Sequence, residues 1–254
     1  MTEIQPLAVV TGASSGVGFE LAKLLADHGF DLLITAPGAG LERAGQELRA
    51  GGVGVQVVHA DLTAYEGVEH LNSAIIKTGR PVAVAALNAG VAQGGAFIDT
   101  DLDDELEMID LNVTSTVHLT KFLLKDMIRR NDGRLLITSS VTGTVPGAKL
   151  AVYDATTSFL HSFAESLQEE LAQTAITVTS LMPGSTDTEV VRHGDPNDTP
   201  LPHSSRDHPA QVAQQGFEAL MAGRDQMLAG ALSTEGRGLL SAVLPDVPGG
   251  LRTV

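Results

Sequence analysis

A glycine-rich segment near the amino terminus has the composition and position of an anion-binding turn. The apolar run Leu7–Val10 leads into Thr11-Gly12-Ala13-Ser14-Ser15-Gly16-Val17-Gly18, and a helical pattern follows. In such a strand–turn–helix unit, backbone N–H groups and the helix N-terminus face a phosphate, and glycines let the backbone approach it. The spacing is G-x-x-x-G-x-G rather than G-x-G-x-x-G, and an ordinary tight turn could use the same residues. The segment predicts a pyrophosphate cradle, with the ordinary turn as the alternative.

Further glycines and polar residues lie at the ends of later strand-like runs or just beyond them. In chain order they are Asn88-Ala89-Gly90, Asn112, Ser140, Tyr153, Pro183-Gly184 and Thr188. Open α/β sheets bind their ligands in the crevice at the carboxyl ends of the strands. We therefore expect these residues to gather around one cleft, although each of them alone also suits a purely structural role.

The elements that must position these residues alternate along the chain. The strands expected are Leu7–Thr11, Asp31–Thr35, Val53–Ala60, Val82–Asn88, Arg134–Ser139, Ile176–Met182 and, more weakly marked, Gln226–Ala229. The helices expected are Gly16–Asp27, Leu102–Arg130 with a bend, Val152–Ala172 and Pro209–Met221, and Thr63–Glu66 has the pattern of a capping box before another helix. Continuous apolar strands are typical of parallel sheets. The alternation predicts one doubly wound α/β domain over residues 1–254, with about seven parallel strands and helices on both faces.

Composition excludes several classes of protein. The chain has 254 residues, a net charge of −15 and no cysteine. The absence of cysteine excludes disulfides, thiolate nucleophiles and cysteine-based metal sites, and the acidic charge argues against nucleic-acid binding. The first apolar run begins too early for a signal peptide to precede it, and no run approaches the ~20 residues that span a bilayer. We expect a soluble, cytoplasmic protein with a small-molecule substrate and no nucleic-acid or membrane partner.

Two stretches lack a regular pattern. Residues 184–208 form the one long irregular segment, and such loops commonly act as lids. This segment holds His193, His203, His208, Asp195, Asp198 and Asp207, without the tight spacing of a metal site. We therefore expect a substrate lid and no metal. The tail 231–254 mixes leucines with prolines and glycines, and it could fold over a neighbour or over the substrate pocket.

The ordered motifs resemble the compact branch of the short-chain dehydrogenase/reductase family, from Leu7 to about Ala229. The resemblance implies a Rossmann-type domain and an NAD(P)-dependent oxidoreductase that interconverts a carbonyl and a secondary alcohol. It implies cofactor contacts from Gly12, Ser14, Ser15, Gly16, Val17, Gly18, Asp61, Leu62, Asn88, Ala89, Gly90, Pro183, Gly184 and Thr188. Asp61 would contact the adenine, and it would equally suit a helix cap near Thr63.

The resemblance also implies catalytic roles and an assembly. Ser140 would hydrogen-bond the substrate oxygen, Tyr153 would move the proton, and Asn112 would hold a water in the proton path. The cofactor would carry the hydride, and the protein would orient it. Members of the family pair helices like those around Phe122 and Phe159 across subunit interfaces, so we expect a homodimer or homotetramer, although both stripes also suit a core.

The chain departs from the family where the catalytic lysine should stand. One helical turn after Tyr153 there is Thr157, a neutral residue that neither grips the cofactor ribose nor lowers the tyrosine pKa. An unperturbed tyrosine has a pKa of about 10, so roughly one molecule in a thousand is tyrosinate at pH 7. Oxidation needs that base and reduction needs the phenol. We therefore expect weak activity biased to reduction, with a non-catalytic cofactor-binding or structural protein as the alternative. Lys149 is a poorly placed substitute for the lysine.

The residues that choose between NAD and NADP are equally unusual. An acidic residue at the end of the second strand selects NAD, and an arginine there accepts the 2′-phosphate of NADP. This chain has Thr35-Ala36-Pro37-Gly38 at that point, and Ser15 before Gly16. Arg43 is the nearest downstream cation. Because no acid repels a phosphate, the sequence favours NADP over NAD.

Overall fold

The strands form one parallel sheet, as predicted. The computed structural model describes residues 5–144, 147–184, 186 and 207–230. In it the strands are β1 (Leu7–Thr11), β2 (Asp31–Ala36), β3 (Val55–His59), β4 (Val82–Leu87), β5 (Gly133–Thr138), β6 (Ile176–Pro183) and β7 (Gln226–Ala229). Their order is β3-β2-β1-β4-β5-β6-β7, and every neighbouring pair is parallel. This is a Rossmann-type α/β sheet.

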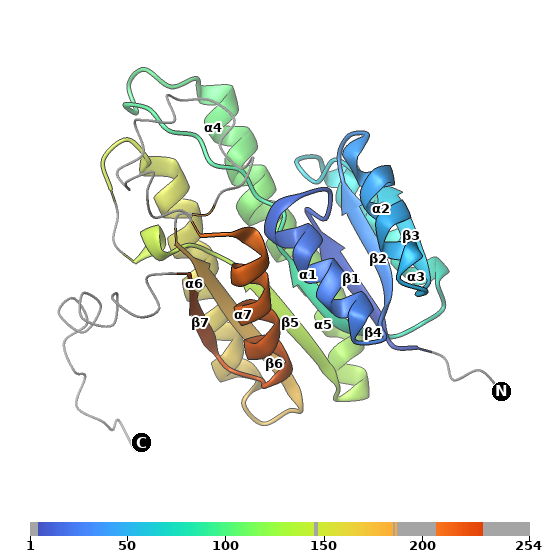
Figure 1. The fold of residues 1–254 in the computed structure, drawn as a ribbon. Coiled ribbons are helices and arrows are strands. Elements are labelled where there is room, and N and C mark those ends of the chain that lie inside the picture. Colours follow the sequence, from blue (N-terminus) through green and yellow to red (C-terminus); the bar gives the residue numbers. More distant parts are fainter. Residues whose placement is uncertain (1–4, 145–146, 185, 187–206, 231–254) are drawn as a thin grey trace, which may run out of the picture.

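Helices cover both faces of the sheet (Figure 1). One face packs against α1 (Gly16–Asp27), α2 (Gly40–Ala50) and α7 (Pro209–Met221). The other packs against α3 (Tyr65–Lys77), α5 (Ser115–Arg130) and α6 (Ala151–Leu171). The strands are apolar throughout because both faces are covered: in β1, Leu7 and Val9 belong to one core, whereas Ala8 and Val10 belong to the other.

The predicted bend in the long helix is a change of helix type. The stretch consists of α4 (Leu102–Ile109), a π-helical segment η1 (Asp110–Thr114) and α5. A π-helical insertion adds a residue to a turn, shifts the side chains that follow and is frequent at functional sites. Asn112 lies inside this segment.

The sequence predicted one helix start wrongly and left another helix without bounds. Helix α2 was given no bounds, because eight of its 11 residues are glycine, alanine or charged, and only Leu41 and Leu48 give a helical apolar pattern. The capping box at Thr63 is not formed, since α3 begins at Tyr65 after Ala64 and has no side-chain cap. Instead, the Thr63 hydroxyl donates to Asp61 Oδ1 at 2.7 Å.

Several predicted features fall outside the described residues. They are Thr188, His193, His203, Asp195, Asp198, most of the proposed lid and the whole tail 231–254. At the edges of the lid, a parallel bridge joins Thr186 to Asp207, and the His208 side chain accepts a hydrogen bond from the Ala210 N–H and caps α7. Among the helices described, none has the length and apolar character that crossing a bilayer requires.

Candidate functional site

A cavity of about 420 Å³ lies at the carboxyl ends of β1, β4, β5 and β6. The predicted residues that line it are Gly12, Ser14, Ser15, Gly16, Val17, Asp61, Leu62, Asn88, Ala89, Gly90, Asn112, Ser140, Tyr153, Thr157, Pro183 and Gly184. Gly18 is not among the lining residues, and Thr188 falls outside the described residues. The structure therefore brings together residues from seven separate segments of the chain.

Some lining residues carried no signal that sequence reasoning could use. They are Thr63, Val91, Ala92, Leu111, Thr138, Ser139, Thr142, Leu150, Leu160 and Thr186. Most are apolar or small, and their types are common throughout the chain. Several of them directly adjoin predicted residues, as Val91 follows Gly90 and Ser139 precedes Ser140, so nearness in the sequence was the available clue.

The glycine turn is held in a conformation that its glycines make possible. Gly12 and Gly16 have φ values of +67° and +57°, which non-glycine residues rarely adopt. Ser15 caps α1 without a side-chain hydrogen bond, so the first-turn N–H groups of α1 have no capping acceptor. Such groups bind phosphate at helix N-termini. The turn therefore has the form of an anion cradle.

Gly18 allows α1 to approach the turn closely. A Cβ there would lie 2.3 Å from the Gly12 carbonyl oxygen and 2.7 Å from Asn88 Nδ2. We expect Gly18→Ala to lower stability by about 1–3 kcal/mol because the turn must move, and thermal denaturation measures this as a lower Tm. The matched control is Gly40→Ala, whose added carbon meets its nearest atom, Ser14 Cβ, at an ordinary 3.7 Å. Equal Tm values for the two variants would contradict the predicted clash.

Asn88 braces the strand ends as well as facing the cavity. The Thr11 hydroxyl oxygen accepts hydrogen bonds from the N–H groups of Asn88 and Ala89, both at 2.9 Å. The Asn88 Oδ1 atom accepts from the Thr138 hydroxyl at 3.1 Å. These bonds tie together the ends of β1, β4 and β5, which fixes the floor of the cavity.

Asp61 has features of both of its expected roles. It lines the cavity and is exposed, as an adenine contact must be. Its Oδ1 atom also accepts from the N–H of Thr63 at 3.0 Å and from the Thr63 hydroxyl, so it shapes the turn before α3. Oδ2 is not occupied by these bonds, and the two roles are therefore compatible.

The side chain of Asn112 is bonded to neighbouring segments and fixes the position of α6. Its Oδ1 atom accepts from the Val91 N–H at 2.9 Å, and its Nδ2 atom donates to the Val91 carbonyl at 2.9 Å and to the Thr156 hydroxyl at 3.1 Å. Thr156 in turn donates to the Tyr153 carbonyl at 2.8 Å. The π-helical segment is thereby linked to the turn of α6 that carries Tyr153. The predicted hold on a water by Asn112 stays a prediction.

Ser140 and Tyr153 meet at the cavity. Ser140 is buried at the end of β5, and its hydroxyl accepts from the Thr142 N–H at 3.3 Å. Burial of the phenol is the largest cause that raises the pKa of Tyr153 above 10, and the Asp154 carboxylate adds to the rise. The side-chain hydrogen bond between Ser140 and Tyr153 works in the opposite direction and lowers that pKa. Tyr153 is therefore a protonated phenol at neutral pH, next to a hydroxyl.

The position of the family lysine holds no cation. Thr157 is buried at the cavity wall, and its hydroxyl donates to the Asp154 carbonyl at 3.1 Å. Lys149 is exposed, has a left-handed backbone with φ of +69°, and is not among the described residues that line the cavity. The structure therefore gives no support to Lys149 as a substitute.

Comparison with known proteins agrees with this geometry. A family model for short chain dehydrogenases matches residues 6–198. The chain is 33% identical over 192 residues to the uncharacterized oxidoreductase YmfI of Bacillus subtilis, covering 74% of this chain and 78% of that protein. It is 32% identical over 222 residues to a provisionally named ketoacyl reductase of Streptomyces coelicolor, covering 85% and 80%.

Solved structures share the fold. A short-chain dehydrogenase from Sphingobium yanoikuyae in complex with NADPH has a TM-score of 0.81 and 24% identity, covering 98% of this chain and 100% of that chain. A variant of actinorhodin polyketide ketoreductase with NADPH has a TM-score of 0.78 and 28% identity, covering 88% and 95%. The family model spans most of this chain, and the relatives match it over three quarters or more of their length. The chain belongs to the short-chain dehydrogenase family.

Proposed function

We propose that this chain is an NAD(P)-dependent oxidoreductase that reduces a carbonyl to a secondary alcohol and oxidises the alcohol only slowly. The observation that carries the proposal is that Tyr153 and Ser140 lie in the same cavity as the glycine turn, where burial raises the pKa of the Tyr153 phenol and favours its protonated form. The similarity to a provisionally named ketoacyl reductase supports the direction. A phenol that stays protonated can donate to a developing alkoxide, whereas it cannot accept a proton from an alcohol.

The residues of the cavity fit a nicotinamide dinucleotide. The backbone at Gly12 and Gly16 and the uncapped start of α1 offer N–H donors to a pyrophosphate. When bound, the cofactor would supply or accept the hydride. Ser140 would hold the carbonyl oxygen, and Tyr153 would give that oxygen its proton. Asn112 and Thr156 would hold the turn of α6 that carries Tyr153 in a fixed position relative to Val91.

A non-catalytic, cofactor-binding protein is the second candidate. Thr157 favours it, because its hydroxyl is short, neutral and already bonded to the Asp154 carbonyl. Thr157 therefore supplies no cation that could bind the cofactor ribose or lower the pKa of Tyr153. The two candidates share cofactor binding and differ in turnover.

Cofactor binding followed by a carbonyl panel tests the proposal. A nucleotide at a hundred times its Kd should stabilise the fold by about 2.7 kcal/mol, which thermal shift detects. Fluorescence of the reduced cofactor gives the Kd itself, free of indole emission because the chain has no tryptophan. Binding with carbonyl-dependent loss of NADPH supports the reductase. Binding without turnover leaves the second candidate, and no binding of either nucleotide rejects both.

We further propose that NADPH binds more tightly than NADH. The end of β2 has no carboxylate at Ala36, Pro37 or Gly38, and Arg43 is exposed in the first turn of the following α2. The acidic neighbour Glu42 is paired with His59 at 3.1 Å. The NADPH-bound ketoreductase relative supports the same choice. We expect Arg43→Gln to weaken NADPH binding while leaving the Kd of NADH unchanged, and tighter binding of NADH by the native chain would contradict the proposal.

A further inference from the structure

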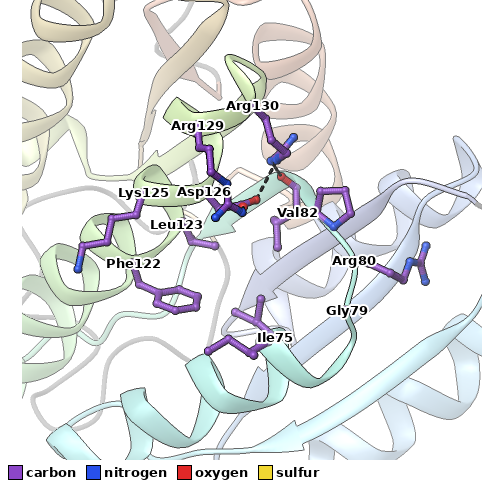
Figure 2. Close-up of a pocket in the computed structure, with 12 residues that line it drawn as sticks. Ile75, Gly79, Arg80, Val82, Phe122, Leu123, Lys125, Asp126, Arg129 and Arg130 are labelled. Atoms are coloured by element: carbon purple, nitrogen blue, oxygen red, sulfur yellow. Dashed lines mark hydrogen bonds and ion pairs between the residues drawn. The ribbon is translucent and has the colours of Figure 1, made fainter.

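A second cavity lies at the opposite end of the sheet from the candidate active site. It has a volume of about 520 Å³ and opens between the end of α3, the loop that leads into β4, and the second half of α5. Figure 2 shows Phe122 on α5 facing Ile75 on α3, and Val82 next to Arg130. This groove is therefore separate from the glycine turn and from Tyr153, and a cavity of this size accommodates a small molecule.

The floor of the groove is apolar. Ile75, Val82 and Leu123 are buried members of the core, and Phe122 is partly buried and packs against that core. Ile76 extends the apolar surface outward and is 65% exposed. Apolar side chains that line a concave surface and continue to an exposed residue are typical of binding sites.

The rim of the groove is basic, although the protein is acidic. The lining contains Arg80, Lys125, Arg129 and Arg130 and a single carboxylate, Asp126, whereas the whole chain has a net charge of −15. Four of its 16 lysines and arginines therefore surround one groove. Charges of one sign around a cleft with apolar walls attract ligands of the opposite sign.

The cations of the rim differ in whether they already form ion pairs within the protein. Arg80 is held by Asp31 at 2.8 Å. Arg130 is held by Asp126 and by the Val82 carbonyl, both at 2.8 Å, and by Asp132 at 3.2 Å. Arg129 contacts Asp126 as well, but its side chain is 77% exposed. Within the described part of the chain, Lys125 has no ion pair. The positive charge open to a ligand is therefore concentrated at Lys125 and Arg129.

We propose that this groove binds a small amphipathic anion, an apolar chain that ends in a carboxylate. The chain would lie on the floor formed by Ile75, Val82 and Phe122, and the carboxylate would lie at Lys125 and Arg129. The apolar floor supplies affinity through burial of the chain, and the two cations select the negative head.

A single reporter in the groove tests this proposal. Because the protein has no tryptophan, Phe122→Trp places its only indole on the floor, and decanoate is the probe. We expect a saturable change in indole emission with decanoate, and a much weaker one with decanol or decyltrimethylammonium. The matched control is Ile128→Trp, on the same helix, 53% exposed and outside the groove lining. Its emission should not respond.

Charge variants and a label-free measurement complete the test. In calorimetric titrations without the reporter, we expect Lys125→Gln with Arg129→Gln to weaken decanoate binding about tenfold. The control, Lys23→Gln with Lys121→Gln, removes the same charge from exposed positions outside the groove and should leave the affinity unchanged.

Three results would overturn the proposal. The first is no binding of decanoate to the native chain in the calorimeter. The second is equal affinity for decanol, which would remove the role of the cations. The third is a response of the Phe122→Trp reporter to polyglutamate but not to decanoate, which would assign the groove to an acidic protein partner.

Discussion

Tyr153→Phe is expected to lower carbonyl reduction by about 10²–10⁴-fold, the usual contribution of a positioned general acid. The change removes one hydroxyl and keeps the ring. Without that hydroxyl Tyr153 gives no proton to the developing alkoxide, and Ser140 loses one of its hydrogen-bond partners. The glycine turn is untouched, so the Kd of the reduced cofactor should stay the same. Single-turnover loss of NADPH fluorescence at saturating cofactor measures the rate, and equilibrium titration measures the Kd.

The other tyrosine of the chain provides the control for this variant. Tyr65 lies on α3, is 68% exposed, and stacks on His118 away from the cavity. Tyr65→Phe should therefore reduce carbonyls at the native rate. A turnover signal that survives Tyr153→Phe would show that the proton comes from elsewhere, and the mechanism proposed for this site would then be wrong.

The part of the site that sequence could predict is the part that follows strand ends. Parallel strands place all their carboxyl ends at one edge, so Asn88, Ser140 and Pro183 had to meet once the strands were recognised. The glycine turn was equally predictable, since a strand, a tight turn and a helix occur there in direct succession. These inferences need only local pattern and one rule of topology.

The remainder depends on contacts between distant segments. Asn112 was placed in a helix, but its bonds to Val91 and Thr156 arise from a π-helical segment that no local pattern marks. Thr63 matched a capping box, yet its hydroxyl bonds to Asp61 instead, because short polar side chains readily bond to nearby groups outside a helix. The groove beside Phe122 also requires α3 and α5 to be placed side by side.

Thr157→Lys is expected to raise alcohol oxidation at pH 7 far more than carbonyl reduction. In the native chain burial and then the Asp154 carboxylate hold the Tyr153 pKa above 10, so fewer than about one molecule in a thousand is tyrosinate at pH 7. Oxidation uses that minor form and should rise about tenfold per pH unit below the pKa. Reduction uses the phenol form, so its rate should not change with pH until the pH approaches the pKa of Tyr153. A lysine ammonium close to the phenolate favours its charged form and lowers the pKa.

The pH profiles of kcat/KM in both directions measure this effect. If the lysine lowers the Tyr153 pKa by about two units, the tyrosinate population at pH 7 rises about a hundredfold, and the rising limb of the oxidation profile moves to lower pH. Thr157→Met is the matched control, because it adds length at the cavity wall without charge and should leave the limb in place. A native enzyme that oxidises alcohols at pH 7 as fast as it reduces carbonyls would contradict the argument. In that case another group must lower the Tyr153 pKa or accept the proton in place of tyrosinate.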